Sequence, residues 1–393
     1  MTSWPTRPLG DLVRPTEIRD PTKTPADEFF YVDIASIDNE TKTIIGAKEI
    51  TGVYAPTRAR KVIRDGDVIV STVRPNLNAV ALVSETFDNQ ICSTGFSVLR
   101  PARDILSRYL FAFVRSRYFV DALVRKTTGA SYPAITDAEV RAVLVPVPPL
   151  AEQQRIARLV DDSDELRKLR ARADSRTDQL IPALFQEMFG DPARNLQGWP
   201  IRSAGELMEA CDYGSSKKAD KTGRGVPVLR MGNVTVTGNL DLEDLKNVEL
   251  PREEFVKQQL RTGDVLFNRT NSRDLVGKTG MWDGRFTAVA ASYFIRMRFL
   301  SGVEHPQHFT TFMNLPFMKH KLAAMARGAI GQANINSQEL KSIPVPVPPF
   351  AMQEEFAQRV TEVRELEATQ AASRLHFEAL FQSVLHDAFD VAA

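Results

Sequence analysis

The chain has 393 residues, of which 43% are hydrophobic and 25% are charged, and its formal net charge is +1 at pH 7. Its length allows two or three domains that each bury a core, and its composition excludes a disordered or fibrous chain. With 2 cysteines, no apolar run of membrane-spanning length and no signal-peptide pattern, we expect a cytoplasmic protein without a disulfide framework. The near-zero net charge neither favours nor excludes nucleic acid, because basic and acidic residues cluster locally.

The first part of the chain predicts a mixed α and β module. Val68 to Val73, Ala79 to Val83 and Phe96 to Leu99 are short apolar, β-branched runs separated by proline, asparagine and glycine, which is typical of strands. From Ile105 to Val124 the apolar residues recur at helical spacing, and His308 to Met325 does the same in the second half. We therefore expect each half of the chain to combine strands with helices.

A helix start and a proline-rich stretch follow in each half. Thr136 and Glu139 have the spacing of a capping box, and Asn336 and Glu339 repeat it. The helix after the first box must be short, since Pro146 lacks an N–H donor and disfavours helical geometry in the residue before it. The Pro-Val-Pro-Pro stretch then predicts a stiff, extended lead into the next element.

A long helix is predicted after each proline-rich stretch. Residues 151–189 lack glycine and have an apolar residue every seven positions from 159 to 180, which is typical of helices packed along a seam. We expect Pro182 to kink or end the first helix near its last turns. The heptad rows are Leu159, Leu166, Ala173 and Leu180 in the first helix, and Phe356, Val363, Gln370, Phe377 and Val384 in the second, with Leu366 and Leu380 on the adjacent row.

The second half of the chain repeats the frame of the first, while the sequences between the repeated segments diverge. The matching pairs are Trp4-Pro5-x-Arg7 with Trp199-Pro200-x-Arg202, Gly66-Asp67-Val68 with Gly263-Asp264-Val265, and residues 145–149 with residues 345–349. We predict the α+β class: two mixed α/β modules, related by a pseudo-twofold internal repeat and separated by two long antiparallel coiled-coil helices. Taken alone, the repeat also fits an old duplication whose halves drifted without consequence.

Several segments carry a resemblance to a known family. Two of them open the long helices, and the others lie in the second module: Pro148-Pro149-Leu150-Ala151-Glu152-Gln153-Gln154-Arg155-Ile156, Pro348-Pro349-Phe350-Ala351-Met352-Gln353, Leu229-Arg230-Met231-Gly232-Asn233-Val234, residues 266–272, residues 275–278 and residues 331–335. With these segments the chain resembles the specificity subunits of type I restriction-modification systems over essentially its whole length. Met352 replaces Glu152 and Phe350 replaces Leu150 between the repeats without breaking the pattern, whereas the first module resembles the family less clearly than the second.

The resemblance implies a non-catalytic DNA-recognition subunit. Residues 1–149 and 195–349 would be two target recognition domains that each read one half of a split site in double-stranded DNA, and residues 150–190 and 350–391 would be helical spacers. The helices would fix the distance between the half-sites and dock two methyltransferase subunits, which restriction subunits then join. Adenine methylation with S-adenosylmethionine and DNA cleavage driven by ATP with magnesium would belong to those partners, and this chain would hold no cofactor.

The candidate DNA-binding residues are of the types that read base edges or bind phosphates. In the second module they are Arg230, Asn233, Asn268, Arg269, Asn271, Ser272, Lys278, Gln332 and Asn334; in the first they are Arg58, Arg60, Lys61, Arg64, Arg74, Asn76, Asn78, Ser131 and Tyr132. For the asparagines and serines the alternative is local turn formation, and for the basic cluster it is an exposed charged face. The residues expected to form the helix seam or to dock partners are Gln153, Ile156, Leu159, Leu166, Leu180, Gln353, Phe356, Val363, Leu366, Phe377 and Leu380.

Motifs for catalysis are incomplete in this sequence. Gly277-Lys278-Thr279 resembles the end of a phosphate-binding loop, but Ser272 stands where that loop needs glycine. Val347 replaces the amide or carboxylate of the tetrad found in amino-methyltransferases, and the 5 histidines lack metal-site spacing. Two alternatives stay open: an enzyme of nucleic-acid modification, which would bind S-adenosylmethionine or nick DNA, and a protein scaffold with paired helices, which would show no salt-sensitive affinity for DNA.

Overall fold

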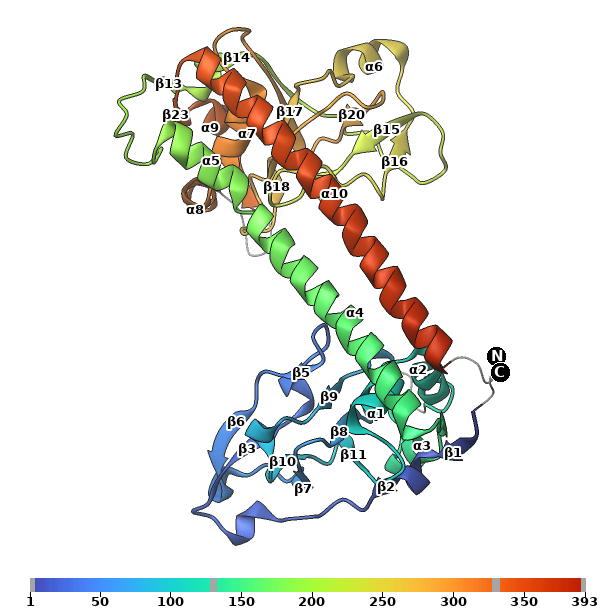
Figure 1. Ribbon diagram of the computed structural model, residues 1–393. Coiled ribbons are helices and arrows are strands. Elements are labelled where there is room, and N and C mark those ends of the chain that lie inside the picture. Colours follow the sequence, from blue (N-terminus) through green and yellow to red (C-terminus); the bar gives the residue numbers. More distant parts are fainter. Residues whose placement is uncertain (1–3, 128–132, 327–332, 390–393) are drawn as a thin grey trace. The chain divides into compact units, whose positions relative to one another are not determined.

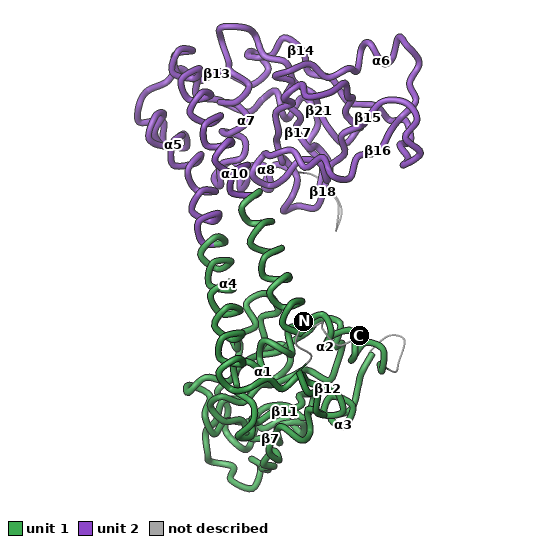
Figure 2. The backbone as a smooth tube through the Cα atoms, turned by 45° about the vertical axis from the view of Figure 1, so that its right-hand side comes forward, with its two compact units in different colours: residues 1–171, 372–393 green, residues 172–371 purple. Residues whose placement is uncertain are grey.

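The computed structural model describes residues 4–127, 133–326 and 333–389, which form two compact units (Figure 1). Unit 1 contains residues 1–171 and 372–393, and unit 2 contains residues 172–371 (Figure 2). Unit 1 therefore combines the first module with the beginning of the first long helical segment and the end of the second. Unit 2 combines the second module with the end of the first segment and the beginning of the second. Nowhere in the described chain does a helix have the length and apolar composition needed to cross a membrane.

Unit 1 holds two four-stranded sheets and two strand pairs. The first sheet has the order β2-β11-β8-β9 and the second β6-β3-β10-β7, in which only β3 and β10 run parallel. The strands are β1 (Thr6–Pro8), β2 (Val13–Arg14), β3 (Glu28–Val32), β4 (Ile37–Asp38), β5 (Thr43–Ile44), β6 (Lys48–Thr51), β7 (Ala59–Ile63), β8 (Val68–Ser71), β9 (Val80–Leu82), β10 (Gln90–Ser93), β11 (Phe96–Pro101) and β12 (Leu144–Pro146). β1 pairs with β12, and β4 pairs with β5.

Unit 2 repeats this plan. Its four-stranded sheet has the order β14-β21-β17-β19, and a three-stranded sheet has the order β16-β15-β20 with β15 and β20 parallel. The strands are β13 (Ile201–Ser203), β14 (Met208–Tyr213), β15 (Val226–Leu229), β16 (Lys246–Val248), β17 (Val265–Asn268), β18 (Thr270–Asn271), β19 (Thr279–Met281), β20 (Val289–Ala290), β21 (Phe294–Phe299), β22 (Ala333–Asn334) and β23 (Pro344–Pro346). The order β2-β11-β8-β9 thus corresponds strand for strand to β14-β21-β17-β19.

The repeated sequence segments are contact partners within each unit. β1 pairs with β12 so that Arg7 lies opposite Val145, and β13 pairs with β23 so that Arg202 lies opposite Val345. The tryptophan-proline segment and the proline-rich segment therefore close each module by lying side by side. A short antiparallel pair tolerates these prolines because a two-stranded edge needs few N–H donors.

The repeated Gly-Asp-Val segment forms a tight turn with a buried ion pair. Gly66 and Gly263 adopt positive φ values of 80° and 86°, a conformation that favours glycine. The aspartates that follow are both 1% exposed, and each binds an arginine on the adjacent strand. The closest contact joins Asp67 to Arg100 at 2.8 Å, and the equivalent pair, Asp264 and Arg298, is 2.6 Å apart. The repeat thus preserves the charged contact that holds this turn to the sheet.

The helices of the two modules also correspond, and each predicted amphipathic helix is split in two. The short helices are α1 (Ser107–Val114), α2 (Arg117–Val124) and α3 (Asp137–Arg141) in unit 1, and α6 (Arg252–Gln258), α7 (Pro306–Asn314), α8 (Pro316–Met325) and α9 (Ser337–Lys341) in unit 2. Ser116 caps the start of α2, and Pro316 begins α8 after Leu315 leaves helical geometry.

The predicted capping boxes at α3 and α9 are both present in the structure. Thr136 Oγ1 accepts from the N–H of Glu139 at 3.2 Å, and Glu139 Oε2 accepts from the N–H of Thr136 at 2.7 Å. Asn336 and Glu339 make the same two contacts, each at 2.9 Å. Both boxes are confirmed, and each fixes the short helix that leads into the proline-rich strand.

Three helices form the long helical part of the chain: α4 (Leu150–Thr177), α5 (Leu180–Phe189) and α10 (Phe350–Phe389). The expected interruption by Pro182 is confirmed, but α4 ends at Thr177, five residues before the proline, and α5 begins at Leu180. A proline ring clashes with the carbonyl of the residue four positions before it, which is Asp178 here, so Pro182 lies in the first turn of a new helix.

In each unit the beginning of one long helix packs with the end of the other helical segment. In unit 1, Ile156 and Val160 of α4 share a core with Phe381 and Leu385 of α10. In unit 2, α5 contributes Phe185 to a core that contains Phe356 of α10, and these two rings lie 5.6 Å apart in an edge-to-face arrangement.

The predicted heptad row on α4 is one residue out of register. Leu159, Leu166 and Leu180 are each 42–43% exposed, whereas Val160 and Ile181 are buried. Leu366 and Leu380 of α10 are likewise exposed, while Phe356 is buried and Val363 packs against the same core. The error arises because polar residues occupy the middle of the inward-facing row, so the leucines on the outer face dominate the apolar pattern.

Candidate nucleic-acid interface

The strongest candidate interface consists of two equivalent loops that each connect a buried strand to its neighbour. Loop 1 (residues 72–79) joins β8 to β9, and loop 2 (residues 269–278) joins β17 to β19. At the base of loop 1 the N–H of Ser71 donates to the carbonyl of Ala79 at 2.9 Å. At the base of loop 2 the N–H of Asn268 donates to the carbonyl of Lys278 at 2.8 Å. The two loops therefore leave their sheets at the same place.

Each loop is also fixed to the segment that precedes the capping box. The N–H of Ile135 donates to the carbonyl of Thr72, and the N–H of Ile335 donates to the carbonyl of Arg269, both at 2.9 Å. In unit 2 this contact extends into the strand pair of β18 and β22, which brings Asn334 next to the start of loop 2. The structure thus gathers nominated residues that are distant in sequence.

Loop 1 presents exposed side chains on a constrained backbone. Arg74 and Asn78 adopt positive φ values of 50° and 46°, which non-glycine residues visit rarely and which are concentrated at functional sites. Arg74, Asn76 and Leu77 lie between or at these positions and are exposed. Leu77 was not among the predicted residues, although it is the exposed apolar side chain of this loop, with 47% of its surface accessible.

Loop 2 presents an arginine and a leucine at its outer part. Arg273 is exposed, with its Nε 3.3 Å from the carbonyl of Ala323, and Leu275 is 37% exposed. Neither had been predicted. Arg269 lies at the start of the loop, where its guanidinium stacks over the ring of Tyr213 at 4.9 Å and donates to Asn334 Oδ1 at 3.0 Å. These contacts hold the Arg269 guanidinium in one orientation.

Three of the nominated residues in loop 2 and at its base stabilise the fold. Asn268 is fully buried, donates to the carbonyls of Thr270 and Tyr293, and accepts from Asn271 Nδ2 at 2.7 Å. Lys278 donates to the carbonyl of Met231 at 2.7 Å, and burial lowers its pKa. Asn268, Asn271 and Lys278 are therefore engaged inside the unit rather than presented to a ligand. Ser272 is half-buried in the same loop.

Arg230 and Asn233 belong to a separate turn in unit 2. Asn233 is 3% exposed; its Oδ1 accepts from the N–H of Arg230 and its Nδ2 donates to the carbonyl of Asp241, both at 2.8 Å. Arg230 in turn binds the carboxylate of Asp244 at 2.9 Å. Asn233 therefore has the role of a turn-forming residue, which was the alternative to base contact, and Arg230 carries a paired charge.

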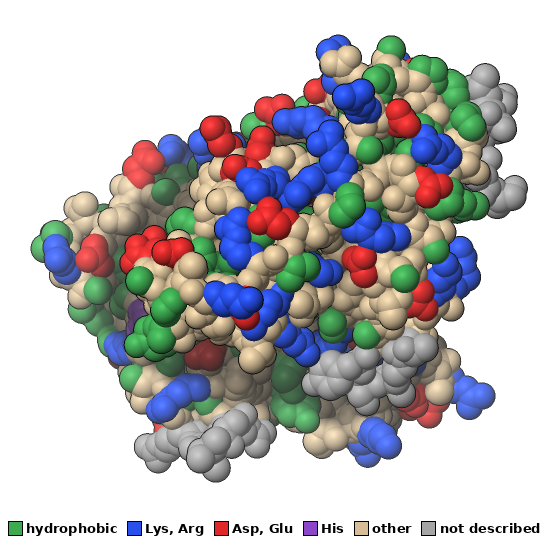
Figure 3. Space-filling model, turned by 90° about the horizontal axis from the view of Figure 1, so that it is seen from below, with side chains coloured by type: hydrophobic (Ala, Val, Ile, Leu, Met, Phe, Trp, Pro, Cys, Tyr) green, Lys and Arg blue, Asp and Glu red, His purple; other side chains and the backbone are tan. Residues whose placement is uncertain are grey.

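The basic cluster of the first module divides in the structure. Lys61 is largely buried and donates to the carbonyl of Phe96 at 2.6 Å, while Arg60 pairs with Asp20 and Arg64 pairs with Glu17. Arg58 is exposed. Figure 3 shows Lys and Arg side chains across the middle of one face of the molecule, with Asp and Glu side chains among them. The cluster therefore behaves mainly as a charged face. Another nominated residue of the first module, Asn78 in loop 1, donates to the carbonyl of Val114.

Three nominated residues, Ser131, Tyr132 and Gln332, lie outside the described residues. Within the described part of the chain, no group of three or more His, Cys, Asp and Glu side chains is placed to hold a metal ion.

The helix glutamines have the same internal role in both units. Gln153 is fully buried; its Oε1 accepts from the N–H of Leu106 at 2.9 Å, and its Nε2 donates to the carbonyls of Asp104 and Pro148. Gln353 is also fully buried and makes the equivalent contacts, beginning with the N–H of His305 at 2.8 Å. These glutamines join the start of each long helix to its module and are not available to dock a partner.

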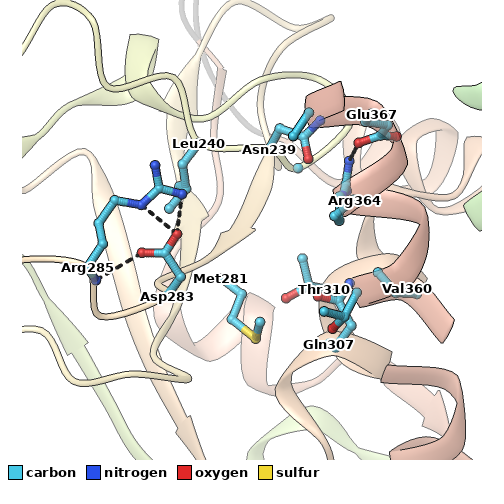
Figure 4. Close-up of a pocket in the computed structure, with 13 residues that line it drawn as sticks. Asn239, Leu240, Met281, Asp283, Arg285, Gln307, Thr310, Val360, Arg364 and Glu367 are labelled. Carbon is cyan, nitrogen blue, oxygen red and sulfur yellow. Dashed lines mark hydrogen bonds and ion pairs between the residues drawn. The ribbon is translucent and has the colours of Figure 1, made fainter. Parts of the chain in front are cut away.

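A cavity of about 460 Å³ lies between the module and α10 in unit 2. Figure 4 shows Gln307 and Thr310 of α7 beside Val360 of α10, with the Asp283 and Arg285 ion pair across the cavity. Thr310 is 4% exposed, and its hydroxyl is buried without a hydrogen-bond partner in the structure. The cavity is thus lined by polar groups from both the module and its helix.

Comparison with known proteins relates this architecture to one family. Residues 1–173 match the family described as the type I restriction modification DNA specificity domain. The specificity subunit of the type I restriction enzyme EcoKI from Escherichia coli strain K12 is 27% identical over 327 residues, which cover 76% of this chain and 68% of that protein.

Solved structures extend the similarity to nearly the full chain. A structure from a study of complex assembly and conformational transition of the type I R-M system is 32% identical, covers 98% of this chain and 97% of that chain, and has a TM-score of 0.67. The type I restriction-modification S subunit from M. genitalium is 12% identical, with 98% and 96% of the two chains covered and a TM-score of 0.57, which shows a shared fold.

Proposed function

Because this chain belongs to the family of type I restriction-modification specificity subunits, we propose that it reads a split site in double-stranded DNA, with one half-site for each unit. Loop 1 reads one half-site and loop 2 reads the other. The helices α4, α5 and α10 set the unread spacer between the half-sites. The chain itself carries recognition and no chemistry.

The observation that supports this proposal is the equivalence of the two loops. Both follow an inner strand of the corresponding sheet, both are fixed to the segment before the capping box, and both expose arginine, asparagine or leucine side chains. Arginine pairs with guanine edges, asparagine pairs with adenine edges, and apolar side chains contact the thymine methyl group. Divergent side chains on a repeated scaffold suit a protein that reads two different half-sites.

The candidate residues differ in the contact they would make. Arg273, Asn76 and Leu77 are exposed and would reach base edges, while Arg74, Arg58 and Ser272 would contact phosphates or bases at the edge of the interface. Arg269 and Asn334 form a fixed pair beside Tyr213, which lowers the entropy lost when a planar guanidinium binds a base.

We further propose that two methyltransferase subunits dock on the helices and that restriction subunits join them. Leu159, Leu166 and Leu380 in unit 1 and Leu180 and Leu366 in unit 2 expose apolar surface that no described residue of this chain covers fully. S-adenosylmethionine, ATP and magnesium are assigned to those partner subunits.

Docking has a simple test. Leu166→Glu should abolish co-purification with the methyltransferase subunit without lowering the melting temperature, since an interfacial charge is costly where apolar surface is buried. Leu196→Glu is the matched control, because Leu196 is 79% exposed but lies outside the helices. Equal co-purification of both variants would contradict the docking surface.

The experiment for the main proposal is base-resolution mapping of methylated adenines in cells that make this chain with its methyltransferase subunit, compared with cells that lack only this chain. We expect a split motif that is present only with the chain. Identical methylation in both, with the partner present and soluble, would overturn the proposal and favour a protein scaffold.

A further inference from the structure

A lysine from a neighbouring element is bound to each of the two loops. In unit 2, Lys319 of α8 donates to the carbonyl of Gly277 and to Asn314 Oδ1, both at 2.6 Å. Gly277 lies near the end of loop 2 and adopts a φ of 83°. Asn314 in turn donates to the carbonyl of Thr279 at 2.6 Å, so α7 and α8 together hold the point where the loop enters β19.

Unit 1 has a lysine at the equivalent carbonyl, but it comes from a different element. Lys42 lies in the turn between β4 and β5, and its Nζ donates to the carbonyl of Asn78 at 2.6 Å. Lys42 itself has a φ of 55°, a conformation with an energetic cost for a non-glycine residue. The strained turn therefore delivers this side chain to loop 1.

Strand register shows that the two carbonyls are equivalent. Val70 lies opposite Val80 in β8 and β9, and Phe267 lies opposite Thr279 in β17 and β19. Counting back from these pairs places Asn78 and Gly277 at the same position, two residues before the strand pairing in both units. Both residues have positive φ. Each carbonyl accepts from the lysine at 2.6 Å, and the carbonyl of Gly277 also accepts from Thr279 Oγ1 at 3.0 Å.

Both lysines carry a cost that a surface lysine does not. Burial lowers the pKa of Lys319 to about 7, and the positive charge of Lys278 makes a smaller contribution in the same direction. Burial lowers the pKa of Lys42 to about 8. The positive charges of Arg115 and Arg167 lower it to a smaller extent, and the negative charge of Asp38 raises it. An ammonium group that gives up water at two unrelated positions to reach the same carbonyl indicates a requirement of the loop rather than of either element.

We propose that Lys42 and Lys319 are positioning residues for DNA recognition, each of which fixes the exit of one loop and so determines base selectivity at one half-site only. The lysine Nζ atoms act through the carbonyls of Asn78 and Gly277 and do not touch DNA. The inference rests on the proposed function, because it assigns a role within recognition to residues that lie outside the reading surface.

The test uses the full chain assembled with its methyltransferase subunit and the variants Lys42→Met and Lys319→Met, with methylated adenines mapped at base resolution. Methionine keeps the length of the side chain but removes its charge and donor. Loss of a hydrogen bond from a charged group should relax discrimination about tenfold at the bases read by one loop. We expect Lys319→Met to relax one half-site, Lys42→Met to relax the other, and each variant to serve as the control for its counterpart.

Lys321→Met provides a control for stability, since Lys321 lies exposed on α8 two residues from Lys319. An unchanged motif in Lys42→Met and Lys319→Met would overturn the inference, and so would equal relaxation of both half-sites together with a lower melting temperature. If Lys319→Met does not fold, Lys42→Met decides the outcome, because Lys42 lies in a short surface turn. A wild-type complex that produces no split motif would instead reject the proposed function itself.

Discussion

The two units have the same scaffold but hold loop 1 and loop 2 in opposite ways. In unit 1 the loop residue Asn78 donates to the carbonyl of Val114 at the end of α1. In unit 2 the helix residue Asn314, at the end of α7, donates to the carbonyl of Thr279 beyond the loop. The same two elements are linked in both units, with the donor side chain on opposite partners. The repeat therefore preserves where a loop is held, while the side chains that hold it and the groups it presents are free to diverge.

The ion pair of Asp67 or Asp264, at the start of the strand that leads into each loop, is expected to matter equally in both units, and its loss should have the largest effect. Asp67→Ala and Asp264→Ala each leave a half-buried arginine without its carboxylate partner, which should lower the free energy of unfolding of the affected unit by about 3 kcal/mol. Hydrogen exchange with peptide resolution would show loss of protection confined to that unit. Asp65→Ala, at an exposed position in the same turn, is the control; an effect as small as that of Asp65→Ala would refute the shared scaffold.

The helix glutamines offer a second test of equivalence. Gln153→Ala and Gln353→Ala each leave buried backbone groups without partners, and we expect each to cost about 2 kcal/mol of stability. Gln154→Ala changes the adjacent, exposed glutamine and should leave the thermal unfolding temperature unchanged. If Gln153→Ala melted at the same temperature as Gln154→Ala, the join between helix and module would have been misassigned.

Exposed residues of loop 1 and loop 2 should affect discrimination at different half-sites. Asn76→Ala and Arg273→Ala should each weaken discrimination at a different half-site by about tenfold, within the range for one base contact. Competition binding by the assembled complex, with DNA changed in one half-site at a time, measures this effect. Arg252→Ala, an exposed arginine on α6, is the matched control. Loss at both half-sites from either variant would contradict one loop for each half-site.

The smallest expected effect is a pH dependence of the stability of unit 2, caused by Lys319. Burial lowers the pKa of Lys319 to about 7, with Lys278 the charged group that faces it, whereas an unfolded lysine titrates near 10.4. Below pH 7 both states are protonated and the cost of the buried charge is fully present. As pH rises from 7 towards 10, the folded state releases its proton first, so the stability of unit 2 should increase relative to Lys319→Met.

Melting curves at pH 6 and pH 9 measure this difference. The melting temperature of the wild-type chain minus that of Lys319→Met should be larger at pH 9, while the same difference for Lys321→Met should not change. A difference that is larger at pH 6 would show that the sign of the linkage, and hence the burial of Lys319, is wrong.

Much of the fold could be predicted from the sequence because the chain contains its own comparison. The strands at residues 68–73, 79–83 and 96–99, the capping boxes and the effect of Pro182 all follow from local rules, and the structure confirms them. The prediction of the heptad row on α4 was wrong, although a comparison of the two repeats could have corrected it. Leu159 aligns with Arg359 in the second copy, whereas Ile156 aligns with Phe356 and Val160 with Val360, and these are the buried positions.

The candidate site was harder to predict because residue type does not reveal burial. Asn268 and Asn271 have the chemistry of base readers, yet their amides bind each other and the nearby backbone. Arg273 and Leu275 follow in the same loop and are exposed, but only strand register identifies the loop. Lys42 and Lys319 had no local signal at all, since each reaches its loop from a distant part of the sequence.

The central claim is that each unit reads one half-site. Its most direct test is to exchange residues 1–145 for those of a relative with a different target and then to map methylated adenines in cells that also contain the methyltransferase subunit. The account predicts that one half-site changes while the other half-site and the spacer stay as they were. A change in both half-sites, or in neither, would contradict it.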